Sequence, residues 1–170
     1  MSDAVKVALQ VATSDEEIPP GAKWDAWVTA ALAGAELDVR VTGCMTLRLV
    51  GRKESQHLNE MYRHKLGPTN VLAFAGVQSE LPDAEDELGD LVICLPVVHD
   101  EAEAQGKSPL AHLAHLVVHG TLHLAGYDHD NEAAAARMEA LETKTMLKLG
   151  FPAPYESDDS QRIDDTINQG

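Results

Sequence analysis

An eleven-residue motif in the second half of the chain, His119-Gly-Thr-Leu-His-Leu-Ala-Gly-Tyr-Asp-His129, strongly restricts the local fold. Residues four apart on a helix share one face, with Cβ atoms about 5–6 Å apart, so His119 and His123 can approach one point from the same side. Glycine readily adopts the left-handed conformation that ends many helices, so Gly126 predicts a helix end. After that turn the chain can return His129 to the same point.

Three neutral imidazole ligands with a fourth position open to water are typical of catalytic zinc sites. We therefore predict that His119, His123 and His129 bind one Zn²⁺ per chain, and that the chain is a metal-dependent hydrolase. The alternative is a merely polar helix face, because His112 and His115 also fall within the same arc of roughly 80°. That alternative leaves the spacing and the glycine unexplained. We expect His115 to orient a ligand or substrate and His112 to be exposed.

Length and composition favour one domain, which we place at residues 1–155. A chain of 170 residues buries roughly 70% of its unfolded surface, enough for a substantial core. Residues 156–170 are acidic and poor in large apolar side chains, which predicts a disordered tail. Cys44 and Cys94 stand alone in apolar contexts, so we expect buried thiols in a reducing compartment. With no apolar leader and no long apolar run, we expect a cytoplasmic protein without a membrane segment.

Hydrophobic periodicity predicts an α+β fold, in which helices pack on a small mixed, partly antiparallel sheet and the metal-binding helix is zincin-like. The apolar strand at 88–95 should be central, and the helix at 55–64 should bury Leu58, Met61 and Tyr62. Pro96 should lie in the first turn of a helix, and Ser108 should cap the metal-binding helix ahead of Pro109. The expected strands are 5–11, 45–50, 70–74 and 88–95, and the expected helices are 24–37, 55–64, 96–105, 108–125 and 132–149.

The histidine frame also occurs in metzincin peptidases, whose pattern is HExxHxxGxxH. There the glutamate after the first histidine is the general base. In this chain Gly120 stands at that position. The metal-binding frame is kept and the peptidase base is lost, which disfavours proteolysis.

The full motif resembles that of the YbeY family of bacterial endoribonucleases, which act in ribosomal RNA maturation and read HGxLHLxGYDH. Two further segments of the sequence also match patterns of this family. The segment Asn59-Glu-Met-Tyr-Arg63 followed by Thr69-Asn-Val-Leu-Ala-Phe74 is similar to the family's N-x-x-[YF]-R and T-D-V-L-S-F segments. Gly89-Asp-Leu-Val-Ile-Cys94 is similar to its G-D-[IV]-x-I strand. Two departures are Asn70 in place of the usual aspartate and Ala73 in place of serine.

The resemblance implies that His119, His123 and His129 are zinc ligands, the first two also catalytic, and that Arg63 is the functional arginine. A guanidinium can hold phosphate oxygens as a bidentate fork, although a solvated cation at a helix end is the simpler interpretation. Asp128 could orient a ligand histidine, or it could only form a turn. The implied activity is cleavage of single-stranded RNA in maturation of the 3′ end of 16S ribosomal RNA and in ribosome quality control.

The net charge of −15 argues against broad affinity for nucleic acids, DNA included. One local region is nevertheless basic, and it comprises Arg48, Arg52, Lys53, Arg63, His64 and Lys65. The expected partners are precursor ribosomal RNA, the small ribosomal subunit and its associated proteins. Two other functions stay open: a non-catalytic ribosome-assembly factor with a structural metal site, and a zincin-like metallopeptidase whose base is Glu85 or Glu87.

Overall fold

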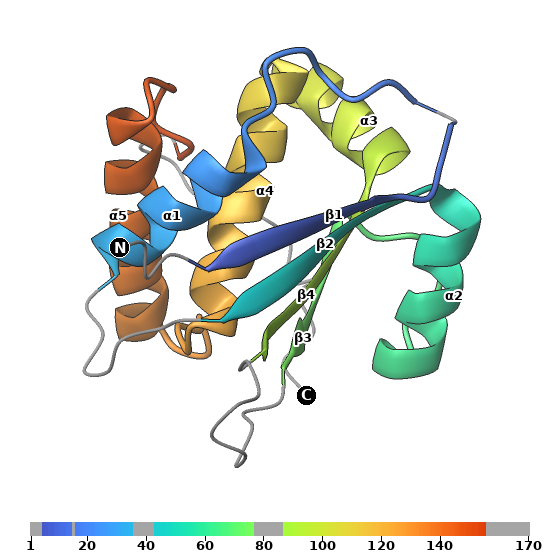
Figure 1. Ribbon diagram of the computed structural model, residues 1–170, viewed down its shortest axis with the longest axis horizontal. Helices are drawn as coiled ribbons and strands as arrows, with labels where there is room; N and C mark the ends of the chain where they lie inside the picture. Colours follow the sequence, from blue (N-terminus) through green and yellow to red (C-terminus); the bar gives the residue numbers. More distant parts are fainter. Residues whose placement is uncertain (1–4, 15, 36–42, 77–86, 156–170) are drawn as a thin grey trace.

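The computed structural model describes residues 5–14, 16–35, 43–76 and 87–155, and in this part helices cover both faces of a four-stranded sheet (Figure 1). The strands are β1 (Lys6–Val11), β2 (Cys44–Val50), β3 (Val71–Ala75) and β4 (Glu87–Cys94). The helices are α1 (Trp24–Gly34), α2 (Arg52–Arg63), α3 (Leu95–Gln105), α4 (Pro109–Leu124) and α5 (Glu132–Lys148).

The sheet is mixed, and its strand order is β1-β2-β4-β3. β1, β2 and β4 run parallel, whereas β3 pairs antiparallel with β4. The prediction of a mixed α+β fold with a central strand at 88–95 is therefore confirmed. Because β4 is hydrogen-bonded on both sides and buried near its end, its sequence is almost continuously apolar from Leu91 to Cys94.

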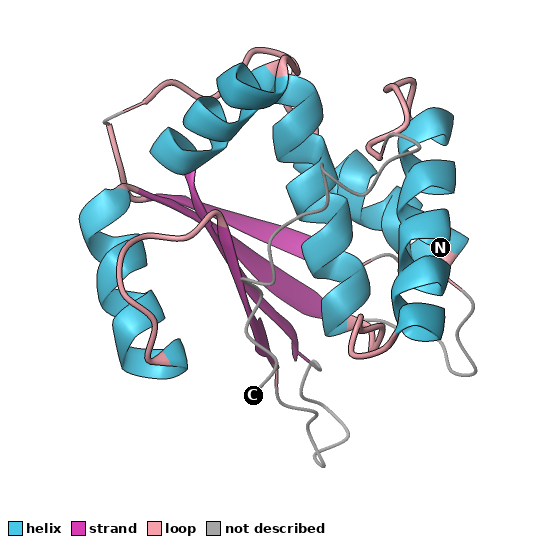
Figure 2. Cartoon of the chain, turned by 180° about the vertical axis from the view of Figure 1, so that it is seen from behind, coloured by secondary structure: helices cyan, strands magenta, loops and turns pink. Residues whose placement is uncertain are grey.

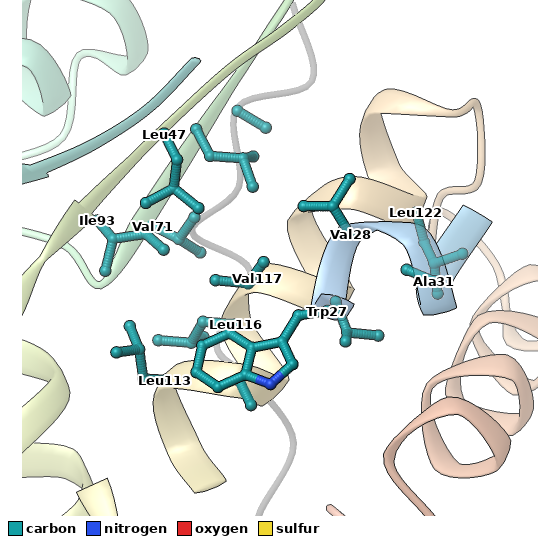
Figure 3. Close-up of a cluster of buried hydrophobic side chains, with 14 of the residues drawn as sticks. Trp27, Val28, Ala31, Leu47, Val71, Ile93, Leu113, Leu116, Val117 and Leu122 are labelled. Carbon is teal, nitrogen blue, oxygen red and sulfur yellow. The ribbon is translucent and has the colours of Figure 1, made fainter. Parts of the chain in front are cut away.

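Alternate residues of β4 enter two separate cores. Leu91 and Ile93 join the main core with α1, α4 and α5, whereas Val92 and Cys94 join a smaller core against α2. In Figure 3, Leu116 and Val117 of α4 lie between the sheet and α1. Figure 2 shows α2 on one side of the sheet and α4 on the other. α4 is thus a central helix, with His112, His115 and His119 buried and His123 half-buried.

The helix boundaries follow their capping residues. Ser108 accepts a hydrogen bond from the backbone N–H of Ala111 at 3.0 Å, and Pro109 opens α4, as expected. Pro96 lies in the first turn of α3, also as expected. No helix among the described residues is long and apolar enough to cross a membrane.

The helix predicted at 55–64 starts earlier than expected, and its inward face is only partly as predicted, since of the three expected residues Leu58 alone packs against a core. α2 begins at Arg52 and buries Ser55 and Asn59, while Met61 and Tyr62 are 49% and 53% exposed. The reason is polar anchoring of the loop that follows. Ser55 Oγ donates to the carbonyl of residue 69 at 2.9 Å, and Asn59 Nδ2 donates to the carbonyl of residue 67 at 2.9 Å. These bonds stabilise the buried polar face in place of apolar packing.

Two further expectations need correction, and one lies beyond the described residues. Cys44 is only half-buried, whereas Cys94 is buried, and neither forms a disulfide. His112, expected to be exposed, is buried because its Nε2 pairs with Glu101 at 2.9 Å. The predicted disordered tail at 156–170 falls outside the described residues, as does Glu85, one of the two glutamates considered as a peptidase base.

Candidate active site

α4 approaches the sheet closely at Gly120, the position of the metzincin glutamate. A Cβ built on Gly120 would lie 2.7 Å from Cδ2 of Leu91, and Leu91 is fully buried in β4. Any side chain at this position would therefore require the buried Leu91 side chain to shift. The close helix–sheet contact favours glycine at this position, and glycine supplies no carboxylate to act as a peptidase base.

The three histidines of the motif lie together beyond this contact. α4 ends at Leu124, and Gly126 follows with a φ of 110°, a conformation that favours glycine. The ring centroid of His129 is 5.8 Å from that of His119 and 6.4 Å from that of His123. Since a zinc-bound nitrogen lies about 2 Å from the metal, three imidazoles on one ion have centroids roughly 5 Å apart. The observed separations are somewhat wider than that.

The buried carboxylate of Glu142 is the main feature that the sequence interpretation missed. Glu142 lies on α5 and is 1% exposed. Its Oε1 accepts from Nε2 of His115 at 2.6 Å and from Nδ1 of His119 at 2.9 Å. The hydroxyl of Tyr155 donates to the same oxygen at 2.9 Å. The sequence does carry a signal, because Glu142 occupies the buried stripe of α5 between Met138 and Met146.

Glu142 is ionised and the His115 ring is neutral. Burial opposes the charged form of Glu142, but the positive potential at the Nδ1 side of the His119 ring and the hydrogen bonds from both rings outweigh it and hold the carboxyl pKa well below its usual range. Burial lowers the pKa of His115 more than its bond to Glu142 raises it. The carboxylate therefore accepts ring N–H groups, which fixes the tautomers of both histidines.

This arrangement fits a metal ligand at His119. With Nδ1–H donated to Glu142, the lone pair is left on Nε2, and that buried atom has no hydrogen-bond partner among the described residues. Ligating histidines commonly donate their other ring N–H to a carboxylate in this way. A small cavity of about 80 Å³ adjoins the site and is lined by His119, His129 and Glu142, among others. Within residues 5–14, 16–35, 43–76 and 87–155, no three His, Cys, Asp or Glu side chains are already spaced to hold an ion.

The other two candidate residues, Asp128 and Arg63, lie outside the cluster of histidine rings. Asp128 Oδ1 accepts from the backbone N–H of Asp130 at 3.3 Å, which is the local turn interaction considered for it. Arg63 is the last residue of α2, on the sheet face opposite α4, and is partly buried. Ring contacts therefore join His115, His119, His123 and His129, whereas Arg63 belongs to a different element and a different face.

Asn70 has a clear structural role. Its Oδ1 accepts from the backbone N–H of Val71, and its Nδ2 donates to Glu101 Oε1 at 3.1 Å. The same Glu101 oxygen accepts from His112. An aspartate at position 70 would keep the first bond but would bring a second carboxylate against Glu101. The amide thus matches its neighbours in this chain, while Ala73 is simply buried in the main core.

Comparisons with known proteins agree with the sequence resemblance. The family model described as Endoribonuclease YbeY matches residues 9–150. A protein named Endoribonuclease YbeY from Pseudomonas putida is 49% identical over 160 residues, covering 94% of this chain and 98% of its own length. One of that name from Coxiella burnetii is 44% identical over 153 residues, covering 89% and 99%. The solution structure of TM1509 from Thermotoga maritima matches with a TM-score of 0.52 at 20% identity, covering 92% and 99%, and it supports the fold alone.

Proposed function

Because the chain belongs to the endoribonuclease YbeY family, we propose that it is a zinc-dependent endoribonuclease that cleaves single-stranded RNA during ribosomal RNA maturation. The observation that carries the proposal is the buried triad of His115, Glu142 and His119, which leaves Nε2 of His119 as a bare acceptor. We further propose maturation of the 3′ end of 16S ribosomal RNA, a role in ribosome quality control, and contact with the small subunit in the cytoplasm.

In this proposal His119, His123 and His129 hold the zinc ion, as in zincin-like sites, with Gly126 forming the turn between the second and third ligands. When bound, the ion would polarise a phosphoryl oxygen and lower the pKa of water toward about 7. Glu142 keeps the His119 ring oriented and its Nδ1 protonated. Asp128 shapes the turn that precedes His129. Arg63 pairs with phosphate oxygens of the substrate.

The two alternatives make different predictions in the same assay. Wild-type protein, zinc-loaded, should cleave an unstructured RNA and leave an unstructured protein substrate intact. Cleavage of the protein substrate would favour a metallopeptidase, against which the close contact of Gly120 with Leu91 already argues. Metal binding without cleavage of either substrate would favour a ribosome-assembly factor with a structural metal site and would contradict the proposed activity.

Arg63→Ala should reduce RNA cleavage while leaving metal content and folding unchanged. Loss of a charged hydrogen bond costs roughly 1.5–3 kcal/mol, so we expect cleavage to fall about tenfold to a hundredfold. Arg63→Lys should recover only part of this, because an ammonium keeps the charge but not the planar fork. The measurement is the rate of RNA cleavage together with the melting temperature.

The matched control is Arg137→Ala, which removes an exposed arginine from α5. Full cleavage by well-folded Arg63→Ala would remove Arg63 from the site. A lowered melting temperature, with cleavage falling only as far as the folded fraction falls, would identify a structural arginine.

A further inference from the structure

The segment that follows α5 returns to the proposed catalytic helix and ends against Glu142. Phe151 packs edge-on against Trp27 of α1, with ring centroids 6.2 Å apart. Lys107 donates through Nζ to the carbonyl of residue 154 at 2.9 Å. These contacts hold residues 151–155 against α1 and the start of α4. The segment therefore has a fixed path, and the position of Tyr155 at its end is determined by it.

Tyr155 makes two contacts with the triad. Its hydroxyl donates to Glu142 Oε1 at 2.9 Å, and its ring stands edge-on to that of His115, with centroids 5.1 Å apart and an interplanar angle of 88°. Oε1 consequently receives three donors, from His115, His119 and Tyr155. The other carboxylate oxygen, Oε2, is buried and has no hydrogen-bond partner among the described residues.

The unequal number of hydrogen bonds on the two oxygens determines how the carboxylate is held in place. All three donors meet at one oxygen, so any rotation of the carboxylate breaks three bonds at once. The hydroxyl of Tyr155 is the only one of the three that does not come from α4. It therefore links the carboxylate to residues 151–155 as well as to the histidine helix, and this restrains the carboxylate from a second direction.

We propose that Tyr155 is a positioning residue: its hydroxyl fixes Glu142, which in turn holds the His119 ring with Nδ1 toward the carboxylate and Nε2 toward the proposed metal position. The inference rests on the proposed metal-dependent function. In this proposal Tyr155 acts on His119 through Glu142, although its side chain also lines the small cavity beside His119 and His129. Partners that orient a ligand histidine typically change metal affinity tenfold to a hundredfold when they are removed. Tyr155 contacts Glu142, and Glu142 contacts the ligand histidine. Because Tyr155 is one residue further from the ligand, the loss of metal affinity should lie at the lower end of that range.

The test compares Tyr155→Phe with wild type in zinc affinity, measured by competition with a chromogenic chelator in the absence of RNA. We expect about tenfold weaker zinc binding, with the melting temperature of the metal-free protein close to wild type because the ring is kept. Tyr155→Ala should show the same loss of affinity together with a lower melting temperature. The control is Tyr62→Phe, an exposed tyrosine on α2, which should bind zinc as wild type does.

A second readout does not depend on metal. In nitrogen-15 spectra of the metal-free protein, the Nδ1–H of His119 should be resolved in wild type and should broaden or exchange faster in Tyr155→Phe. Unchanged zinc affinity and an unchanged His119 signal in Tyr155→Phe would overturn the proposal. If wild type bound no zinc, the proposed function would fail, while the His119 signal would still decide whether Tyr155 positions the triad.

Discussion

The double variant His119→Ala with His123→Ala should lose both its zinc and its RNA cleavage, while wild type should carry one Zn²⁺ per chain. The two substitutions remove two of the three proposed ligands, and a single remaining imidazole cannot hold the ion at micromolar concentrations. Cleavage should fall to background, because the ion supplies the activated water and the charge stabilisation. Elemental analysis and an RNA cleavage assay on the same preparation measure both effects.

The matched control is His57→Ala, which removes an exposed histidine from α2. That variant should keep its metal and its activity. Metal retained at full stoichiometry in the double variant would contradict the ligand assignment. Metal binding should also raise the melting temperature of wild type but not of the double variant, because a ligand that binds only the folded state stabilises it.

Glu142→Ala should be the most destabilising single substitution in the site. It leaves the buried N–H groups of His115 and His119 without their acceptor, at about 1–3 kcal/mol each, and it opens a cavity between α4 and α5. We therefore expect a loss of about 3 kcal/mol or more in the free energy of unfolding. Urea denaturation of the metal-free protein measures this loss without any contribution from zinc binding.

The variant Glu142→Gln separates the effect of losing the negative charge from the effect of losing the packed side chain. The amide keeps the volume, but one of its ends presents N–H groups to rings that also donate, so only part of the network can form. We expect a smaller loss of stability than in Glu142→Ala, together with zinc affinity tenfold to a hundredfold weaker than wild type. Glu132→Gln, an exposed change on the same helix, should alter stability by less than about 0.5 kcal/mol. Wild-type zinc affinity in a folded Glu142→Gln protein would exclude Glu142 from the site.

Regular secondary structure and the histidine motif were accessible from the sequence because their determinants are local. Ser108 and Pro109 mark the start of α4, and the apolar run of β4 identifies an interior strand. The mixed sheet followed from the same patterns. The inward face of α2 was not accessible, because Ser55 and Asn59 are buried by hydrogen bonds to a loop eight to fourteen residues away.

The carboxylates that pair with the buried histidines could also not be predicted from local sequence patterns. Glu142 lies 23 residues from His119, and a single glutamate on an amphipathic helix is ordinarily a solvated residue. The burial of His112 depends on Glu101 of α3, eleven residues away. In both cases the pairing is set by the packing of one helix on another. Periodicity can indicate which face of a helix is buried, but it does not identify the partner of a buried charge.

The late position of Glu142 in the chain has a consequence for protein synthesis. α4 reaches the end of its sequence before α5 has been made, so at that stage His115 and His119 have no carboxylate to accept their ring protons. Packing the helix against the sheet would then bury two unpaired donors, which is unfavourable. Docking of α5 against α4 therefore supplies the acceptor that these two rings need once they are buried. The histidine cluster and its carboxylate are therefore complete only after α5 has been synthesised.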